Sequence, residues 1–567
     1  MFHVFLLSNI AAFYVLLTHH IHMYQLNYYD PAEERNRLRE NRWPNFGRVF
    51  GFFLSIAAIV IFGASDKFKI SLAVAIFFNI ASAYLGWDRT VKIPLKYTKR
   101  AIRLFVSTMI LYLLLVSFCM LLAVKKMQSP LIAAVSVQAL PFFSAYVMML
   151  ADYINKPIEK SINQGFIDDA KRIIAADKKL TVIGVTGSYG KTSVKNILKT
   201  LLAGDYNVLA TPGNFNTTLG VVITIRQHLT PVHDIFVCEM GAKKLGEIKE
   251  ICDIAKPKYG IITSIGPCHL ETFGSMGNIV KTKFELQEAV EQNGGTIFLN
   301  YDNDCIRKKT VDSDKVVYFT DESPYAKYKS SQNSLHSKDV RKQNEARMQD
   351  GNSQSESYAE DTKDKNSQNE LCAKDIKVDE NGTSFTLNLD GKDMHFQTSL
   401  LGKHNIVNIA GCIALAKKLG VSNETLVSRV KMIQPVQHRQ EVLKRPFGLI
   451  IDDAYNSNPD GAKSALDTLS LFDMTKIVVT PGMIELGDEF YLRNRTFGEQ
   501  IADVADYVVL VGEKQTAPIQ DGLNEKGYPN DKIYIYSNMA DALSFAVNLK
   551  TTNKKAILIE NDLPDNY

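Results

Sequence analysis

The chain has 567 residues, with 65 Lys and Arg against 61 Asp and Glu, and its formal net charge is +4 at pH 7. This length predicts several domains, and so small a net charge gives no whole-chain case for binding nucleic acid. The 7 cysteines are scattered without a Cys-x-x-Cys pair. That pattern argues against a disulfide framework or a zinc site and is typical of a reducing compartment.

The first 150 residues are strongly apolar, in contrast to the ordinary composition that follows. They contain apolar runs near 1–18, 49–64, 70–87, 104–124 and 130–150. The last two runs are long enough to cross the hydrocarbon core of a membrane as helices. The first run has neither a basic start nor a small-residue cleavage site, so we interpret it as a retained helix. We therefore predict about five transmembrane helices within residues 1–155.

Basic residues are concentrated in two of the polar segments between these runs, 35–48 and 88–103. Because basic loops stay in the cytoplasm, we predict an outside N-terminus and a chain that enters the cytoplasm after about residue 150. No Asp or Glu interrupts the runs, which favours anchoring over transport. Two roles stay open for this region: a pure anchor, and a holder of a lipid-linked substrate. The predicted location is the cell membrane, multi-pass, with cytoplasmic catalytic domains.

Residues 181–196 read TVIGVTGSYGKTSVKN. A β-branched strand, a glycine-rich turn and a helix start predict a phosphate-binding loop, because a helix N-terminus offers unpaired N–H groups to an anion. Lys191 would reach the terminal phosphates, and the hydroxyl of Thr192 or Ser193 would bind Mg²⁺. The position where the usual loop has its first glycine is Val185. The turn residues expected to contact phosphate are Gly187, Ser188 and Gly190.

The TGSxGKT[ST] form of this loop resembles the ATP-binding loop of the Mur ligase family, which builds the peptide stem of the bacterial cell wall. EMGA at 239–242, GPCHLE at 266–271 and DDAYNSNP at 452–459 occur in the family's order. The similarity is greatest to the type that adds D-alanyl-D-alanine, the MurF type, and it covers roughly 180–560. The fold class we expect is therefore an α-helical membrane region followed by α/β domains.

The resemblance also predicts the domain organisation. Residues 156–434 would form a P-loop-type central ATPase domain, and residues 435–567 a Rossmann-like C-terminal domain. The family's uridine-nucleotide-binding domain is missing, and the membrane region at 1–155 stands in its place. Residues 322–378 have almost no aliphatic side chains and many charges of both signs, so we expect a disordered insertion or a long exposed loop.

Two strand ends carry the candidate metal ligands. Glu239 closes an apolar strand beside the phosphate loop, where a carboxylate is placed to hold Mg²⁺. His269 follows the end of another apolar strand and is a candidate second ligand. In the family, a lysine after this histidine is carbamylated and binds a second Mg²⁺; Lys283 falls at that position, with Lys281 as the alternative. The resemblance thus implies ATP, two Mg²⁺ sites held by Thr192, Glu239, His269 and Lys283, and catalytic roles for Lys191, His269 and Lys283.

The resemblance implies further ligand contacts. For ATP these are Asn300, Arg439 and Asp453, with Arg439 reaching ATP across a cleft between the domains. For the substrates they are Asn214, Asn216, Tyr455, Asn456 and Asn458. Two positions depart from the family: Asn494 stands where a histidine is common, and ENDLPDNY at 560–567 replaces a Lys-Gly-Ser-Arg turn. That turn lies near the substrates in the family, so the departure concerns acceptor or amine specificity.

Together these patterns predict an ATP-dependent ligase of peptidoglycan precursor synthesis that forms an amide through an acyl phosphate. Its partners would be the membrane, ATP, a cell-wall precursor peptide and D-alanyl-D-alanine or a similar amine, and no nucleic acid. The alternative is a non-catalytic or differently specific Mur-like membrane protein that acts on, or scaffolds, a lipid-linked envelope substrate. An ATP-driven transporter is disfavoured because the sequence has no second nucleotide-binding signature.

Overall fold

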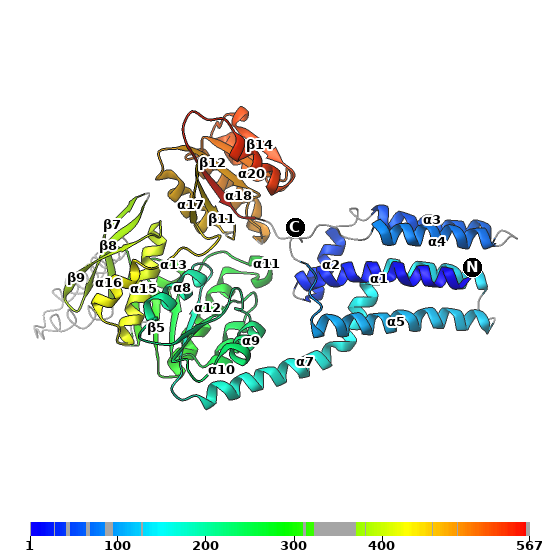
Figure 1. Ribbon diagram of the computed structural model, residues 1–567, viewed down its shortest axis with the longest axis horizontal. Coiled ribbons are helices and arrows are strands. Elements are labelled where there is room, and N and C mark those ends of the chain that lie inside the picture. The colour runs from blue at the N-terminus through cyan, green and yellow to red at the C-terminus, as the bar shows by residue number, and fades with distance from the viewer. Residues whose placement is uncertain are drawn as a thin grey trace, which may run out of the picture. The chain divides into compact units, whose positions relative to one another are not determined.

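The computed structural model describes residues 2–27, 29–40, 46–63, 68–85, 94–125, 129–309, 313, 315–321, 370–379, 381–455, 458–484 and 486–562. The chain forms two compact units, Met1–Gly165 and Phe166–Asp562 (Figure 1). Asn456 lies outside the described residues, as does most of the segment predicted to be an insertion.

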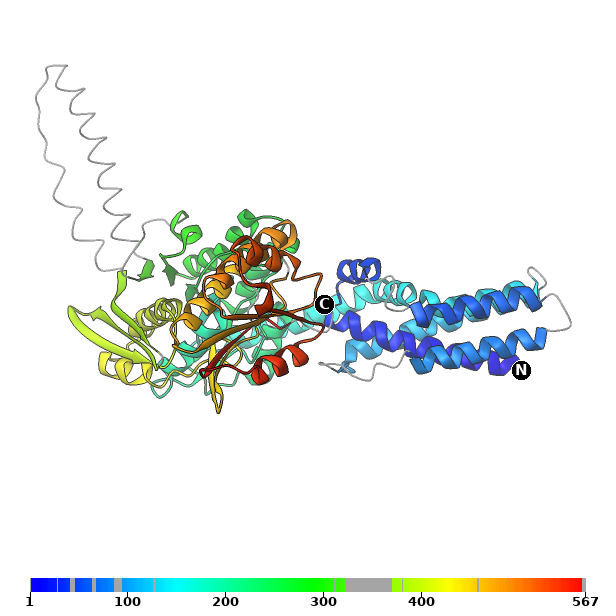
Figure 2. The same ribbon diagram turned by 90° about the horizontal axis from the view of Figure 1, so that it is seen from above.

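The N-terminal unit is a bundle of helices that lie lengthwise beside one another (Figures 1 and 2). Its elements are α1 (Phe2–Leu26), α2 (Pro31–Glu40), α3 (Phe46–Gly63), α4 (Phe68–Leu85), α5 (Lys99–Val124), α6 (Pro130–Ala139), the 3₁₀ turn η1 (Leu140–Phe143) and α7 (Ser144–Ala176). All five predicted apolar runs are helical over their described residues. The first helix continues eight residues past the predicted run 1–18, because His20, His22 and Tyr24 are buried against the other helices.

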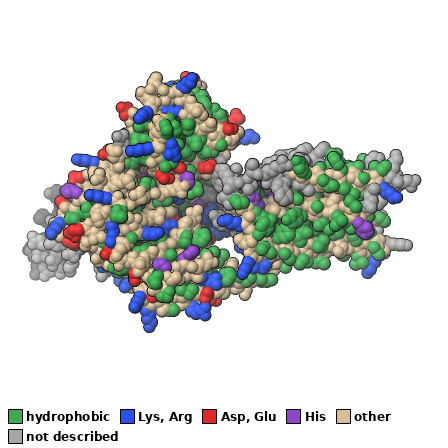
Figure 3. Space-filling model, viewed as in Figure 1, with side chains coloured by type: hydrophobic (Ala, Val, Ile, Leu, Met, Phe, Trp, Pro, Cys, Tyr) green, Lys and Arg blue, Asp and Glu red, His purple; other side chains and the backbone are tan. Residues whose placement is uncertain are grey.

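Among the residues that the structure describes, three helical stretches are long and apolar enough to cross a membrane: Phe2–Leu26, Lys99–Val124 and Pro130–Ala176. Lys69–Ala81 is apolar but shorter. Hydrophobic side chains cover much of the visible face of this unit (Figure 3). Leu7, Phe77 and Leu114 are 65%, 66% and 62% exposed, which is the arrangement expected of side chains that face lipid. The transmembrane topology with an outside N-terminus stays a prediction.

A polar cluster fills the centre of the bundle. Asn9 and Asn79 both donate to the Gln138 side-chain oxygen, at 3.2 and 3.3 Å, and Gln138 donates to Ser55 at 2.7 Å. Tyr112 donates to Asn9, which brings in a further helix. In an apolar bundle such hydrogen bonds replace those that water would make, so they fix how the helices pack.

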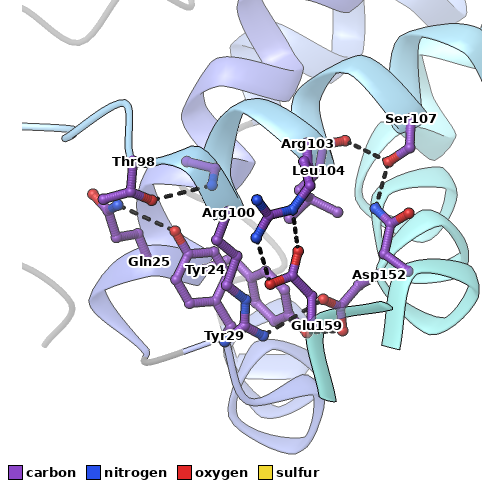
Figure 4. Close-up of polar contacts among 12 residues, drawn as sticks. Tyr24, Gln25, Tyr29, Thr98, Arg100, Arg103, Leu104, Ser107, Asp152 and Glu159 are labelled. Atoms are coloured by element: carbon purple, nitrogen blue, oxygen red, sulfur yellow. Dashed lines mark hydrogen bonds and ion pairs between the residues drawn. The ribbon is translucent and has the colours of Figure 1, made fainter. Parts of the chain in front are cut away.

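A second polar group ties α5 to α7 at one end of the bundle (Figure 4). Arg103 forms a two-pronged ion pair with Glu159 at 2.6 and 2.7 Å. The Arg100 guanidinium lies 4.1 Å from the Tyr29 ring centre and 3.8 Å from Asp152. Paired arginine forks of this kind add geometric specificity to a helix contact.

The second unit begins with a nine-stranded sheet in the order β2-β3-β1-β4-β5-β6-β7-β8-β9. Its strands are β1 (Thr181–Thr186), β2 (Val208–Ala210), β3 (Ile235–Glu239), β4 (Tyr259–Ile262), β5 (Thr296–Asn300), β6 (Val316–Thr320), β7 (Glu370–Asp379), β8 (Gly382–Leu389) and β9 (Lys392–Thr398). Strands β1 to β7 run parallel, and β8 and β9 extend the sheet as antiparallel neighbours.

Helices cover both faces of this sheet. They are α8 (Lys191–Leu202), α9 (Thr218–His228), α10 (Glu247–Ala255), α11 (Leu270–Phe273), α12 (Met276–Gln292), α13 (Asp304–Arg307), α15 (Lys403–Lys418) and α16 (Asn423–Val430). One apolar core lies between the sheet and α8 and α15, and a second lies between the sheet and α9, α10 and α12. Strands buried on both faces read as continuous apolar runs, which explains segments such as Ile235–Glu239.

The C-terminal end of the predicted insertion is wrong. Residues 322–369 lie outside the described residues, but 370–378 belong to β7, which pairs with β6 and β8. Leu371 and Ala373 are buried on one face of that strand, whereas Lys374 and Asp375 are exposed. The charged, exposed residues give this segment the composition of a disordered region, so its short alternating pattern was not recognised as a strand.

A six-stranded sheet follows, in the order β10-β11-β15-β12-β13-β14. Its elements are β10 (Glu441–Arg445), β11 (Gly448–Asp453), α17 (Pro459–Ser470), β12 (Thr475–Thr480), α18 (Phe490–Ala502), β13 (Tyr507–Val511), α19 (Ala517–Glu525), β14 (Ile533–Tyr536), α20 (Met539–Asn548) and β15 (Lys555–Glu560). Only β10 is antiparallel to its neighbour within this sheet. The predicted fold class, a helical N-terminal region followed by two α/β domains, is confirmed.

Candidate active site

The loop predicted to bind phosphate lies between the end of β1 at Thr186 and the start of α8 at Lys191. Gly187 and Gly190 have φ angles of 151° and 79°, a region that favours glycine. A Cβ at Gly187 would lie 2.0 Å from the Thr263 hydroxyl oxygen. The close approach of the loop to β4 therefore excludes any larger residue at Gly187.

The loop is held from the other side by the segment after β4. The Ser188 hydroxyl donates to the Gly266 carbonyl at 3.0 Å, and the Tyr189 hydroxyl donates to the Pro267 carbonyl at 2.8 Å. The Ser188 amide donates to the Ser264 carbonyl at 2.7 Å. The GPCHLE segment therefore packs directly against the glycine-rich loop.

Lys191 is folded back onto its own loop. Its ammonium group donates to the carbonyl groups of Gly187 and Ser188 at 2.8 and 2.9 Å. Burial lowers the pKa of Lys191, while the charge of the Glu239 carboxylate acts in the opposite direction. The ammonium group thus has internal partners that phosphate oxygens could replace.

Thr192, Asn216 and Glu239 meet at the end of β3. The Thr192 hydroxyl and the Asn216 amide each donate to the same Glu239 oxygen at 3.1 Å. Burial raises the pKa of Glu239, but the charges of Lys195 and Lys191 outweigh it and leave the pKa below its usual value. The Glu239 carboxylate is therefore negatively charged, and it lies beside the N-terminus of α8, the helix that follows the loop.

Lys195 is a residue of this site that sequence reasoning missed. Its ammonium group lies 2.8 Å from the second Glu239 oxygen and donates to the Gly213 carbonyl at 2.9 Å. Lys195 is four residues after Lys191 on α8, so the two side chains share a helix face. This four-residue spacing is the sequence pattern from which Lys195 could have been predicted as a site residue.

The donor set fits Mg²⁺ only in part. Within the described part of the chain, no three His, Cys, Asp or Glu side chains gather to hold a metal ion. Mg²⁺ usually takes one or two protein carboxylates or hydroxyls and completes its shell with phosphate and water oxygens. Thr192 and Glu239 match that requirement. In this structure, however, the ammonium group of Lys195 forms an ion pair with the Glu239 carboxylate.

Lys283 lies on α12 with only 1% of its surface exposed, whereas Lys281 is exposed. Burial, together with the smaller effect of the charge of Lys191, lowers the pKa of Lys283 to about 8. A substantial fraction of this amine is therefore neutral near pH 8. His269 directly precedes α11 as its N-cap residue, with a φ angle of 51°.

A cleft of about 320 Å³ lies between the two α/β domains. Six of the predicted site residues line it, three from the first domain and three from the second: Gly190, Ser193, Asn300, Arg439, Asp453 and Asn458. Tyr455 is 61% exposed and packs on His438, and Asn214 is exposed in the loop after β2. The predicted nucleotide contacts thus converge better than the predicted substrate contacts.

The two walls of the cleft touch through His404 of α15 and Ser464 of α17, whose side chains lie 2.7 Å apart. His404 is open to the cleft, but desolvation by the surrounding protein lowers its pKa to about 4, so the ring is neutral at pH 7 and can accept the Ser464 hydroxyl. Asp302, also in the cleft wall, has its pKa raised by burial to about 6. The contact between His404 and Ser464 left no signal in the sequence.

Asn494 fixes a turn after β12. It is fully buried, donates to the Met483 and Phe490 carbonyls at 3.0 Å and accepts from the Met483 amide at 2.8 Å. The residue that stands in place of the family's histidine therefore has a structural role here.

A glycine-rich phosphate loop at the edge of a parallel sheet, facing a second α/β domain across a cleft, defines a two-domain nucleotide-binding protein. Comparison with protein families makes this specific. The model of the Mur ligase middle domain matches residues 185–350 and 343–416, and that of the Mur ligase glutamate ligase domain matches residues 438–560. The chain belongs to the Mur ligase family, whose members are ATP-dependent ligases that form amide bonds.

Among curated relatives, the chain is 28% identical over 367 residues to the UDP-N-acetylmuramoyl-tripeptide–D-alanyl-D-alanine ligase of Bacillus subtilis, covering 64% of this chain and 69% of that protein. It is 27% identical over 338 residues to the ligase of the same name from Escherichia coli, covering 59% and 65%. The corresponding ligase of Mycobacterium leprae is 29% identical over 297 residues, covering 51% and 50%. The chain thus spans between half and about two thirds of these relatives.

Solved structures show the same fold. MurF from Acinetobacter baumannii superposes with a TM-score of 0.57 at 23% identity, over 70% of this chain and 77% of that one. MurF ligase from Thermotoga maritima in complex with ADP gives 0.56 at 23% identity, over 70% and 80%.

Proposed function

We propose that this protein is an ATP-dependent amide ligase of the MurF type that works in peptidoglycan precursor synthesis at the cytoplasmic face of the membrane. The observation that carries this proposal is the cleft, which gathers the phosphate loop, Arg439 and Asp453 from two domains. The relatives named above add D-alanyl-D-alanine according to their names, and the same amine or a similar one is the substrate that we propose here.

In this proposal ATP lies in the cleft. The backbone amides of the loop and the N-terminus of α8 bind its phosphates, and Lys191 exchanges the Gly187 and Ser188 carbonyls for phosphate oxygens. Arg439 adds charge from the opposite wall, Asp453 accepts from the ribose, and Asn300 contacts the base. Such positioning and charge neutralisation supply most of the catalysis of phosphoryl transfer.

The reaction has two steps. A carboxylate oxygen of the precursor peptide attacks the γ-phosphorus of ATP, which breaks the bond to ADP and leaves an acyl phosphate. The amine then attacks the acyl carbon, loses a proton and expels inorganic phosphate, so that an amide bond replaces the anhydride bond of the acyl phosphate. Bringing both reactants into one closed site converts these steps into effectively unimolecular ones.

Thr192 and Glu239 would hold one Mg²⁺, and His269 and a modified Lys283 a second; bound Mg²⁺ supplies neutralisation of the phosphate charge. Two observations support the modification of Lys283. Its amine is partly neutral near pH 8, and a neutral amine is the form that adds CO₂ and releases a proton to give a carbamate. The product exchanges a buried cation for an anion, which suits a metal site.

The substrates would bind beside the loop at Asn214 and Asn216 and beside the segment with Tyr455, Asn456 and Asn458. The described part of residues 1–165 forms helices, where the resemblance would place the family's uridine-binding domain. We therefore propose an acceptor that is lipid-linked. The apolar helices would anchor the enzyme to the membrane, hold that acceptor, or do both.

To test this, the purified full-length protein is incubated with ATP, D-alanyl-D-alanine and a precursor peptide. The peptide is either soluble and uridine-linked or lipid-linked, and the masses of the products are measured by mass spectrometry. We expect a mass gain of one dipeptide on the lipid-linked acceptor. Lys191→Ala should lower turnover by about 10²-fold or more, as does removal of other preorganised charge stabilisers. Unchanged amine-dependent phosphate release in that variant would contradict the site assignment.

A second candidate is a non-catalytic scaffold, or a ligase with other substrates, on a lipid-linked envelope precursor. It is favoured by the structural use of Asn494 and by Glu560-Asn561-Asp562 in place of the Lys-Gly-Ser-Arg turn. Phosphate release that rises when an amine is added separates the ligase from a scaffold.

A further inference from the structure

Two carboxyl groups face each other at the ends of β11 and β15. Asp453 and Glu560 are directly paired residues on these neighbouring parallel strands. They are 2% and 0% exposed, respectively. Parallel partners in register point to the same side of a sheet, so the two acids share one buried space at the edge of the cleft.

Glu560 has no ordinary partner in that space. Within the described part of the chain, no N–H or O–H group of another side chain or of the backbone donates to either of its oxygens. The charged or titratable group that acts on Glu560 is Asp453. Lys555 begins the same strand, but its ammonium group is bound at the other end, to the Val547 and Leu549 carbonyls.

Asp453 has the contacts of a charged acceptor. One of its oxygens accepts the Gln440 amide at 3.2 Å, and the side chain lines the cleft. The neighbouring Asp452 is engaged by His438 at 2.8 Å. The further charged residues that line the cleft are Asp302, Asp321, Lys403, Arg439 and Asp460.

Two buried carboxylates in contact cannot both be ionised at modest cost, and such pairs hold one proton between them. The contacts of the two side chains indicate that Glu560 holds this proton. Asp453 already accepts a backbone N–H and meets the cleft, whereas Glu560 lies deeper and has nothing else to accept from. Burial and the neighbouring Asp453 both raise the pKa of Glu560, in agreement with this assignment.

We propose that Glu560 is a positioning residue, which stays protonated and donates a hydrogen bond to the Asp453 carboxylate, so that Asp453 is held toward the cleft to accept from a nucleotide. The inference rests on the proposed role of Asp453 in binding ATP. It assigns a purpose to the acid that stands where MurF-type ligases have the Lys-Gly-Ser-Arg turn.

The test compares Glu560→Gln, which keeps a donor and is neutral at every pH, with Glu560→Leu, which has none. Glu525→Gln, on the surface of the same domain, is the matched control. The full-length protein is purified in detergent, and ADP affinity is measured by calorimetry between pH 6 and pH 9. The infrared band of a protonated carboxyl group is recorded without nucleotide at pH 8, where Asp302, whose pKa is about 6, is ionised.

We expect Glu560→Gln and Glu525→Gln to bind ADP like the unmodified protein at pH 7, and Glu560→Leu to bind about tenfold more weakly, as for the loss of one hydrogen bond to a charged group. Affinity should fall with rising pH in the unmodified protein, because ionised Glu560 repels Asp453, and should stay level in Glu560→Gln. The infrared band should disappear in Glu560→Gln and persist in Glu525→Gln.

Equal ADP affinity of Glu560→Leu and the unmodified protein would overturn the inference, as would an infrared band that survives Glu560→Gln. A band that is lost when K⁺ or Mg²⁺ is added would also overturn it, because a cation would then occupy the pair. If Glu560→Leu does not fold, the pH profile of Glu560→Gln decides. If no variant binds ADP, the proposed function fails, while the infrared band still decides on the shared proton.

Discussion

Lys195 stands between the phosphate loop and the carboxylate at the end of β3. Its ammonium group pairs with Glu239 at 2.8 Å, and both side chains are almost fully buried. Burying two charges is tolerable only while each has its partner, so removal of one leaves the other uncompensated. Lys195 is therefore both a source of stability and a competitor for any metal ion at Glu239.

We expect Lys195→Met to lower the free energy of unfolding by about 3 kcal/mol in the absence of Mg²⁺, because Glu239 loses its buried partner. Added Mg²⁺ should recover part of this loss, measured as a larger rise in melting temperature than in the unmodified protein. Lys199→Met changes an exposed lysine of the same helix and is the control. An equal response of both variants to Mg²⁺ would argue against a metal ion at Glu239.

Lys283 gives a prediction about pH. Its pKa in the folded protein is about 8, lower than the usual lysine value of about 10.4. Between these values the unfolded chain binds a proton that the folded chain has lost, so stability rises as the pH increases through this window. Comparing melting temperatures with those of Lys283→Met from pH 7 to pH 10 should show this rise only in the unmodified protein.

The same lysine tests the carbamate. Bicarbonate should raise the melting temperature of the unmodified protein in the presence of Mg²⁺ and leave that of Lys283→Met unchanged. Lys281→Met, at the exposed neighbouring lysine, should behave like the unmodified protein. A bicarbonate effect that follows Lys281 would instead select the alternative position.

At the scale of elements, α7 is one helix from Ser144 to Ala176 and contains Pro157. A proline inside a helix removes one backbone hydrogen bond and favours a kink. Arg103 of α5 binds Glu159 just after this proline, through two hydrogen bonds of 2.6 and 2.7 Å. The ion pair therefore supports α7 where its own hydrogen bonding is interrupted.

We expect Glu159→Gln to lower the free energy of unfolding by about 1 to 2 kcal/mol, since the pair is half-buried and two-pronged. Asp169→Asn breaks the ion pair with Arg172, which is 78% exposed, and the one with Arg226, and serves as the comparison within the same helix. Thermal unfolding in detergent measures both. A larger effect of Asp169→Asn would mean that α7 depends more on its C-terminal contacts than on Glu159.

Whether a contact in the site could be predicted depends on whether a local sequence pattern places both of its residues. The turn from β1 to α8 was predictable because its glycines, Lys191 and Thr192 are contiguous. The meeting of Thr192 and Glu239 was predictable because Glu239 ends β3 and Thr192 lies at the start of the helix after β1, the neighbouring parallel strand. The contact between His404 and Ser464 joins two helices 60 residues apart, and no local pattern encodes it. The strand β7 was missed because its exposed charged half dominates its composition.

At the scale of the whole molecule, the second unit carries its own apolar cores. Ile167, Ile173 and Ile174, at the end of α7, pack against one of them, so a chain that begins at Phe166 keeps that contact. The catalytic and nucleotide-binding residues that we propose all lie in this unit.

We therefore expect residues 166–562 alone to fold and to bind ADP with the affinity of the full chain. The two roles left open for the helical unit then separate. If the helices only anchor, this fragment ligates a lipid-linked acceptor in detergent about as fast as the full chain. If they hold the acceptor, the fragment turns over with a raised KM for that acceptor and an unchanged KM for ATP.

The folded-back position of Lys191 has a consequence for inhibitor chemistry. Its ammonium group is already satisfied by two carbonyls of its own loop, so a neutral compound in the cleft gains nothing from it. An anionic compound must first displace those carbonyls from the ammonium group. A single weakly charged group would compensate poorly for the two lost hydrogen bonds. Selective compounds for this protein would therefore carry two adjacent acidic groups, or avoid the lysine and bind the opposite wall.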